Sequence, residues 1–213
     1  MPIDSQVAHL DVPEAGRETG RKDIRDAGSD GARLSLAPAR LAPEQILMRL
    51  NDALAHDINI LSVEKVHPRF HARHDAKSRT YVYQISRRRD AFGKRFVWWV
   101  RDPLDLDAMR KAAGVLTGFH DFRSFGDVET SEQDTRVDLT RLDIRESGDR
   151  ILIEITGSHF LWKMVRRIVG VLVEVGRGKM PVETVEGFLD HPSRDPARMT
   201  APPSGLFLER VGY

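Results

Sequence analysis

Apolar residues recur at every third or fourth position in several parts of the chain, which is the pattern of amphipathic helices. In the first such segment, Ile46, Leu47, Leu50 and Leu54 would share one face behind a proline that can open a helix. A second such segment, Leu106 to Leu116, is followed by Gly118, and a glycine commonly ends a helix. The pattern therefore predicts helices starting at Pro43, over Leu106 to Leu116, over Phe160 to Val175, and starting at Pro181.

Other segments alternate apolar and polar residues with the period of two that is typical of strands. Two of them flank Ser147-Gly148-Asp149, which predicts a hairpin turn. Strands outnumber the helices that could cross between them, so we expect an α+β fold, with a mostly antiparallel mixed sheet and helices packed on it. The predicted strands are Gln6 to Val12, Asp57 to Val66, Arg79 to Arg87, Phe96 to Arg101, Thr135 to Arg145, Arg150 to Thr156, and Leu206 to Val211.

The N-terminal part of the chain differs in composition from the rest. Pro13 to Pro38 mixes charges, glycine and alanine with few apolar residues, so it cannot bury a core of its own. We therefore expect three parts: a strand within residues 1–12, a flexible insertion over 13–40, and one folded domain over 41–213.

Composition excludes several classes of protein. The 213 residues include no cysteine, which excludes disulfides and thiolate metal sites. No apolar run approaches the roughly 20 residues that cross a membrane, and the first residues have no signal-peptide pattern. These observations predict a cytoplasmic protein with no membrane partner.

Positive charge is concentrated in one part of a nearly neutral chain. Lys65 to Arg101 contains eleven basic residues and only Asp75 and Asp90 as acids, a net charge of +9, while the remaining residues carry −8. Aromatic residues are interleaved with these cations. Such a zone is either a solvated basic face or a surface for a phosphate backbone, and the aromatic residues favour RNA.

A second group of cations lies beside an apolar stripe, in GSHFLWKMVRRIVGVLVEVGRG (Gly157 to Gly178). Lys163, Arg166 and Arg167 fall within one turn of the apolar positions. A cation is costly to desolvate there unless an anion meets it, and that anion is either a carboxylate of the protein or a phosphate.

Four segments, in order, resemble motifs of the TruA-type tRNA pseudouridine synthases. They are FHARHDAKSRTYVYQI (Phe70 to Ile85), GFHDFRSFG (Gly118 to Gly126), the segment Gly157 to Gly178, and TAPPSGLFLERVGY (Thr200 to Tyr213). The resemblance implies isomerisation of uridine to pseudouridine in the anticodon arm of tRNA, by a homodimer that needs neither metal nor redox cofactor. It also implies that residues 41–213 are the catalytic and RNA-binding domain, and that the strand within residues 1–12 is the remnant of a truncated N-terminal half.

The resemblance also implies roles for single residues. Tyr81 matches the active-site tyrosine that supports the flipped uracil, and Arg166 matches the arginine that pairs with the catalytic aspartate. Leu161 matches an apolar residue near the base. Without that aspartate, Arg166 is expected to have no structural partner. The remaining expected contacts, with the tRNA backbone, come from Arg73, Lys77, Arg79, His71 and Lys163.

One motif of the family has no counterpart here. Its nucleophilic aspartate lies in a GRTDxGVHA loop shortly before a strand, and only five residues precede the matching strand at Gln6. Three hypotheses follow: a synthase that is incomplete at its N-terminus, an RNA-binding protein without catalysis, or a synthase using another carboxylate, for instance one from the insertion. The resemblance therefore leaves enzymatic activity of these 213 residues uncertain.

Two further patterns resemble ligand sites but are better explained by local structure. His67, His71 and His74 could hold zinc if they shared a helix face, but Pro68 interrupts the segment, so no metal site is expected. The glycines of Val175 to Lys179 could suggest phosphate binding. They follow a helix rather than open one, so a helix C-cap is the better interpretation.

Overall fold

The computed structural model describes residues 41–127 and 134–213, which form two units, 41–74 and 75–213. The expected strand over 6–12 and insertion over 13–40 lie outside the described residues. The three-part domain organisation therefore stays a prediction.

The first unit contains helix α1 (Pro43–Ala53) followed by an irregular segment. The predicted apolar face is confirmed, because Ile46, Leu47, Leu50 and Leu54 are each partly buried. The predicted strand over Asp57 to Val66 is wrong. Asn51 instead binds both backbone groups of Ile60, donating to its oxygen at 2.9 Å and accepting from its nitrogen at 2.7 Å. This side chain supplies the hydrogen bonds that a strand partner would otherwise supply.

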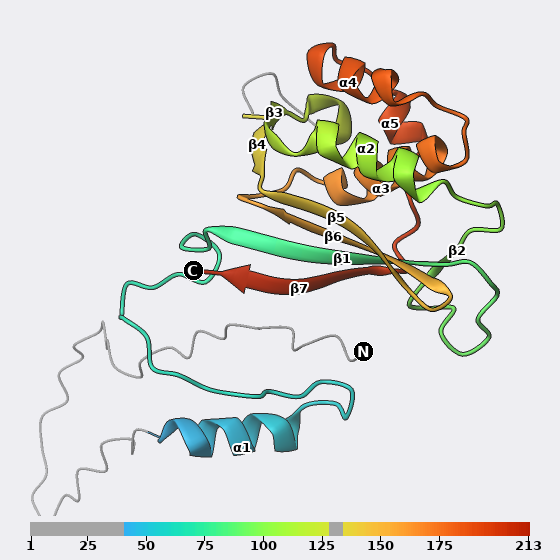
Figure 1. The fold of residues 1–213 in the computed structure, drawn as a ribbon. Coiled ribbons are helices and arrows are strands. Elements are labelled where there is room, and N and C mark those ends of the chain that lie inside the picture. Colours follow the sequence, from blue (N-terminus) through green and yellow to red (C-terminus); the bar gives the residue numbers. More distant parts are fainter. Residues whose placement is uncertain (1–40, 128–133) are drawn as a thin grey trace, which may run out of the picture. The chain divides into compact units, whose positions relative to one another are not determined.

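The second unit is built on a five-stranded mixed sheet (Figure 1). Strand β1 (Ser78–Ser86) lies at its centre, antiparallel to β6 (Arg150–Gly157) and β7 (Leu206–Gly212) and parallel to the short β2 (Trp98–Trp99). Strand β5 (Arg141–Ser147) pairs with β6 as the predicted hairpin. The fold class is confirmed as α+β with a mostly antiparallel sheet.

The segment Thr135 to Arg145, predicted as one strand, serves two sheets. Strand β4 (Arg136–Leu139) pairs with β3 (Gly118–Asp121), and the chain then enters the main sheet as β5 after Thr140. The predicted strand over Phe96 to Arg101 is likewise shorter than expected, with only Trp98 and Trp99 paired. Alternation predicts extended backbone, but it does not say which partner each residue meets.

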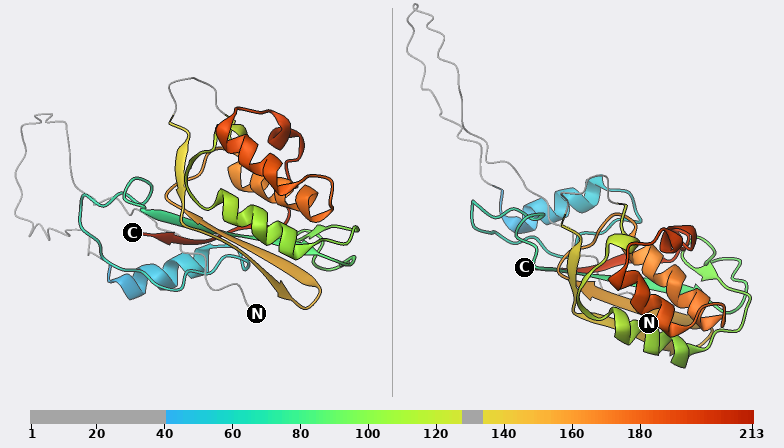
Figure 2. Two further views of the ribbon diagram at one scale, coloured as in Figure 1. Left: turned by 45° about the horizontal axis from the view of Figure 1, so that its top comes forward. Right: turned by 90° about the horizontal axis from the view of Figure 1, so that it is seen from above.

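Helices cover one face of the main sheet (Figure 2). They are α2 (Leu106–Leu116), α3 (Met164–Gly176), α4 (Val182–Asp190) and α5 (Asp195–Arg198), with a short 3₁₀ turn, η1 (Arg123–Phe125), beside them. Alternate residues of β1 and β6, including Tyr83, Ile85 and Ile153, point into this layer and are fully buried. Helix α3 supplies the largest apolar stripe of the core.

The opposite face of the sheet is polar. Arg141 and Arg145 both pair with Glu154 there, and Arg150 donates to Gln84 at 2.7 Å. Positive and negative side chains alternate across these strands and neutralise one another. No helix in the described parts of the chain is long and apolar enough to span a membrane.

Candidate active site

Helix α3 begins later than the apolar pattern predicted. The expected start was Phe160, but the first helical residue is Met164, because Lys163 adopts a left-handed conformation with φ of 64°. This conformation is uncommon for a residue with a side chain and reverses the chain direction just before the helix. Residues 158–163 therefore form a separate loop, which we call the α3 entry loop.

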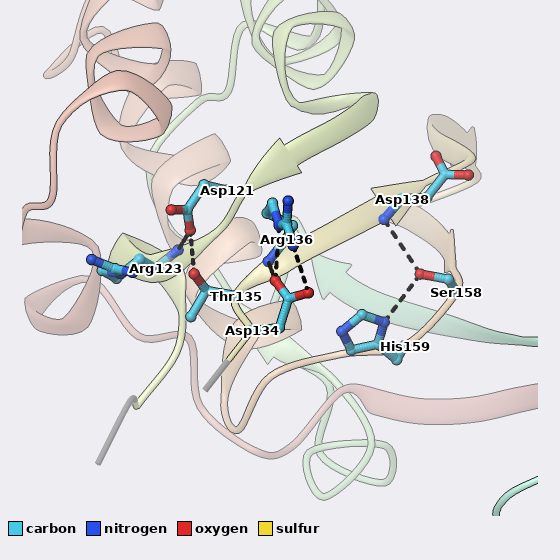
Figure 3. A network of polar contacts seen from close by, with 8 residues as sticks. All are labelled: Asp121, Arg123, Asp134, Thr135, Arg136, Asp138, Ser158 and His159. Carbon is cyan, nitrogen blue, oxygen red and sulfur yellow. Dashed lines mark hydrogen bonds and ion pairs between the residues drawn. The ribbon is translucent and has the colours of Figure 1, made fainter. Parts of the chain in front are cut away.

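The start of the α3 entry loop is fixed by Ser158 (Figure 3). Its N–H donates to the Asp138 carbonyl at 2.9 Å, and its hydroxyl accepts from the Asp138 N–H at 3.3 Å. Its carbonyl accepts from Arg79 Nη1 at 3.1 Å. The loop is thus joined to both β4 and β1.

Neighbouring contacts in the same network hold the ends of β3 and β4 (Figure 3). Asp121 accepts hydrogen bonds from the Thr135 hydroxyl and from the Arg123 N–H. Asp134 pairs with the guanidinium of Arg136, which lowers the pKa of Asp134 to about 2. This aspartate is therefore ionised at neutral pH and neutralises the arginine beside it.

Tyr81 lies where the α3 entry loop meets the sheet. Its ring packs edge-on against Phe160, with centroids 5.2 Å apart, and it is partly buried beside the core. A bulge between Thr80 and Tyr81 shifts the register with β7 at this point. Burial raises the pKa of the Tyr81 hydroxyl, and Arg79 opposes this rise. Within the described residues the hydroxyl has no hydrogen-bond partner, so it is available to a ligand.

Arg166 is held from behind by the C-terminal segment. Its Nε donates to the Ala201 carbonyl at 2.6 Å, and its own carbonyl accepts from the Ala201 N–H at 3.0 Å. The expectation that Arg166 has no structural partner was therefore wrong. Among the described residues, however, it forms no ion pair, and its terminal nitrogens remain available to an anion.

The segment that holds Arg166 is itself bound to β1. Tyr83 donates its hydroxyl to the Pro202 carbonyl at 2.8 Å, and burial raises the pKa of this tyrosine. Gly205 has φ of 101°, and a Cβ there would lie 2.7 Å from the Gln84 carbonyl oxygen. The prolines and the glycine of this motif thus serve a close passage of backbone over the sheet.

Leu161 is buried against Gly126, where an added Cβ would lie 2.5 Å from the Leu161 side chain. Three consecutive elements thus carry the predicted groups: β1 carries Tyr81, the α3 entry loop carries Leu161 and packs Phe160 on Tyr81, and the first turn of α3 carries Arg166, which lies near Tyr83. A flat aromatic ring, an apolar side chain and a cation are the groups that hold a base and an anion.

Two of the remaining predicted site residues are close to the α3 entry loop: Arg79 binds it, and Lys163 belongs to it. Lys77 is exposed and its backbone is bound to Gly212, while Arg79 binds Ser158. Arg73 and His71 belong to the first unit, where His71 Nδ1 accepts from the Arg73 and His74 backbone at 3.3 Å. No group of three potential metal-ligating side chains occurs within residues 41–127 and 134–213.

Comparison with known proteins identifies the family of this chain. A family model described as tRNA pseudouridine synthase matches residues 112–213. The chain is 35% identical to tRNA pseudouridine synthase A 2 of Bacillus cereus and 40% identical to tRNA pseudouridine synthase A of Moorella thermoacetica. Each match covers 82% of this chain and 72% of the relative. The chain belongs to the tRNA pseudouridine synthase family.

In this family member, sequence reasoning missed a carboxylate beside the site. Asp127 follows the GFHDFRSFG motif and pairs with Lys163 at 2.8 Å and with the buried guanidinium of Arg167. Lys163 donates the hydrogen bond that contributes most to lowering the pKa of Asp127. The cations beside the apolar stripe thus meet different partners: a carboxylate for Lys163 and Arg167, and a backbone carbonyl for Arg166. The only sequence signal was the position of Asp127 at the end of a motif.

Replacing Asp127 with asparagine is expected to destabilise the fold by about 1–2 kcal/mol, because it leaves Arg167 buried without a counter-ion. The full cost of breaking a buried pair is reduced here because the Asp127 side chain is 39% exposed to solvent. Urea unfolding at neutral pH measures the loss. Asp143→Asn, which breaks an exposed pair with Arg141, is the matched control and should change stability little.

The substitution Asp127→Asn should also change the pH dependence of stability. The pKa of Asp127 is lowered in the folded state, so its contribution is complete above the unfolded value of about 4 and is lost as pH falls through the folded pKa. The wild-type chain should therefore lose this stability in acid, whereas Asp127→Asn should not. Parallel acid profiles of the two proteins would contradict the assignment.

Proposed function

We propose that this chain takes part in the isomerisation of uridine to pseudouridine in the anticodon arm of tRNA. The observation that carries the proposal is that Tyr81 packs on Phe160 of the α3 entry loop, which leads directly into the turn of α3 that carries Arg166. The terminal nitrogens of Arg166 form no ion pair with a carboxylate of the described residues. The relatives' names supply the reaction and the class of RNA.

The reaction requires the target base to leave the helical stack and enter a pocket. The bond between the ribose C1′ and N1 of the base breaks, the base turns, and a bond forms between C1′ and C5. The proton on C5 is lost to solvent, and N1 gains one. In the proposed arrangement the ring of Tyr81 supports the base, Leu161 closes its apolar side, and the Tyr81 hydroxyl takes part in proton transfer.

Arg166 is proposed to act on the catalytic aspartate of the family. A guanidinium at hydrogen-bond distance favours the ionised carboxylate and fixes its orientation. Its Nε bond to Ala201 leaves the outer nitrogens to face that anion. No aspartate in the described residues occupies this position, and within these 213 residues no segment matches the GRTDxGVHA loop.

Further proposals concern the substrate and the assembly. Arg73, Lys77, Arg79, His71 and Lys163 are proposed to contact the tRNA backbone, with the charge of Lys163 shared with Asp127. We also propose that the protein acts in the cytoplasm and as a homodimer. These proposals rest on the family and on the basic zone around β1.

The activity is tested by release of tritium from tRNA labelled at C5 of uridine. Two polypeptides are compared: these 213 residues alone, and the same residues preceded by a segment carrying the family's GRTDxGVHA loop. Only the second is expected to turn over, because a missing nucleophile costs several orders of magnitude. Replacing the loop aspartate with asparagine is the control.

Other outcomes point to the alternatives. Binding of tRNA by both polypeptides without turnover by either would favour an RNA-binding protein that does not catalyse. Turnover by the 213 residues alone would favour a different carboxylate, and Glu18, Asp23, Asp26 and Asp30 would be the first to replace.

A further inference from the structure

The chain between β1 and α2 carries a concentration of charge that the proposed site does not use. Residues 87–101, which we call the basic-aromatic loop and which include β2, contain six basic residues and one acid. Arg87 pairs with Glu146 and Arg88 with Asp149 on the neighbouring hairpin. No carboxylate of the described residues pairs with the other four cations, Arg89, Lys94, Arg95 and Arg101, and all four are exposed.

Aromatic side chains are exposed on the same loop. Phe92 is 98% exposed, and Phe96 and Trp99 are also exposed. The guanidinium of Arg89 lies over the Trp99 ring, 4.7 Å from its centroid. Exposed rings interleaved with cations bind single-stranded nucleic acid, because every base offers a face for stacking and every nucleotide a phosphate.

The loop is held in its conformation before any ligand binds. Asp90 accepts from the N–H groups of Phe92 and Gly93 at 3.1 and 2.7 Å, and pairs with Arg150. A Cβ at Gly93 would lie 2.4 Å from the Asp90 carboxylate, so a larger residue there would displace this side chain from its hydrogen bonds. The return strand is fixed by the pairing of Ile85 with Trp98. A fixed loop loses little conformational entropy on binding.

The loop lies at the end of the sheet opposite the C-terminus (Figure 1). Tyr81 and Ser86 are five residues apart on β1, which corresponds to about 17 Å along a strand. We therefore expect the loop to contact a nucleotide other than the one whose base is held at Tyr81.

We infer that the basic-aromatic loop is a second RNA-binding surface, which holds the backbone of the substrate tRNA through Arg89, Lys94, Arg95 and Arg101 and stacks an unpaired base on Phe92. The inference rests on the proposed tRNA substrate. An anionic membrane is the weaker match, because a single fully exposed phenylalanine offers little apolar area for insertion.

The test uses the full chain and unmodified tRNA, with affinity measured from about 50 to about 200 mM salt. Lys94→Gln/Arg95→Gln should lower the slope of log affinity against log salt by about 1.4 to 1.8, at roughly 0.7 to 0.9 per phosphate contact. Phe92→Ala should weaken binding about fivefold or more with an unchanged slope, because it removes stacking and no charge. Lys111→Gln/Arg194→Gln is the matched control, since both residues are exposed on the helical layer.

The results separate this inference from the proposed function. A wild-type chain that does not bind tRNA overturns both. If the wild type binds tRNA and both loop variants keep the wild-type affinity and salt slope, this inference alone is overturned. Loop variants that keep tRNA binding but lose binding to phosphatidylserine vesicles would overturn it in favour of a membrane surface.

Discussion

Replacing Arg166 with methionine is expected to lower the rate of pseudouridine formation about 100-fold or more, in the polypeptide that carries the family's aspartate loop. The apolar stem remains, but the charge that keeps the catalytic aspartate ionised and oriented is lost, and removing one fixed electrostatic group from an active site typically costs about 100- to 1,000-fold. Tritium release at saturating tRNA measures the effect. The affinity for tRNA should change little, because a single charge is removed from a large interface.

The role of Arg166 is separated from a structural one by the pH profile. If its guanidinium keeps the aspartate ionised, the variant should have a higher pKa for that carboxylate, and its remaining activity should need higher pH. Arg166→Lys keeps the charge but not the fork of donors, so it should recover only part of the rate. A variant with normal rate and normal pH profile would show that Arg166 is not part of the catalytic group.

Stability should fall only modestly in Arg166→Met. The lost hydrogen bond from Nε to the Ala201 carbonyl is worth about 1 kcal/mol. A cation without a structural partner, as the sequence predicted for Arg166, could instead be replaced with unchanged or slightly raised stability. A backbone carbonyl leaves no trace in the amino-acid pattern, so this partner could be found only from the fold.

Several elements were predictable because local signals agreed with tertiary packing. Helix α2 begins and ends at the residues that the apolar period predicted, and Asp105 caps it by accepting from two N–H groups. The end of α3 was predicted from its glycines. Gly178 has φ of 70°, and Lys179 donates to the Glu174 carbonyl, as in a helix C-cap.

The errors occur where distant parts of the chain decide the local conformation. Phe160 and Leu161 fit a helical period, but Phe160 packs against Tyr81 and Leu161 packs against Gly126. The left-handed conformation of Lys163 then places the start of the helix after these residues. Periodicity counts apolar residues without saying what they contact. It therefore assigned to the helix a loop that forms one wall of the candidate site.

The candidate site was predictable only in part. Tyr81 and Arg166 were predicted from motif resemblance, and the structure provides the reason for their surroundings. Arg166 is oriented by the backbone carbonyl of Ala201, and the segment that supplies it is held by the bond from Tyr83 to the Pro202 carbonyl. Such groups depend on the path of the chain rather than on residue type, so no composition or spacing could indicate them.

Gly170 in α3 shows how closely this path is constrained. A Cβ at this position would lie 1.7 Å from the Met199 carbonyl oxygen and 3.3 Å from the Ala201 nitrogen. The segment that holds Arg166 therefore passes directly over the helix at a point where only glycine fits. Backbone cannot rotate away as a flexible side chain can, so the strain has to be relieved by moving either α3 or the segment itself.

Gly170→Ala is accordingly expected to destabilise the fold by about 3 kcal/mol, at the upper end of typical overpacking costs. For a chain of this size that corresponds to a fall in Tm of roughly 6–12 °C. Gly187→Ala in α4 is the matched control: it is also a glycine inside a helix, but an added Cβ would meet nothing within 4 Å. It should raise stability by about 0.5–1 kcal/mol, because alanine favours the helix over glycine. Thermal unfolding of both variants beside the wild type measures these opposite signs. If Gly170→Ala were as stable as Gly187→Ala, the segment would not be packed on α3, and the orientation proposed for Arg166 would lose its support.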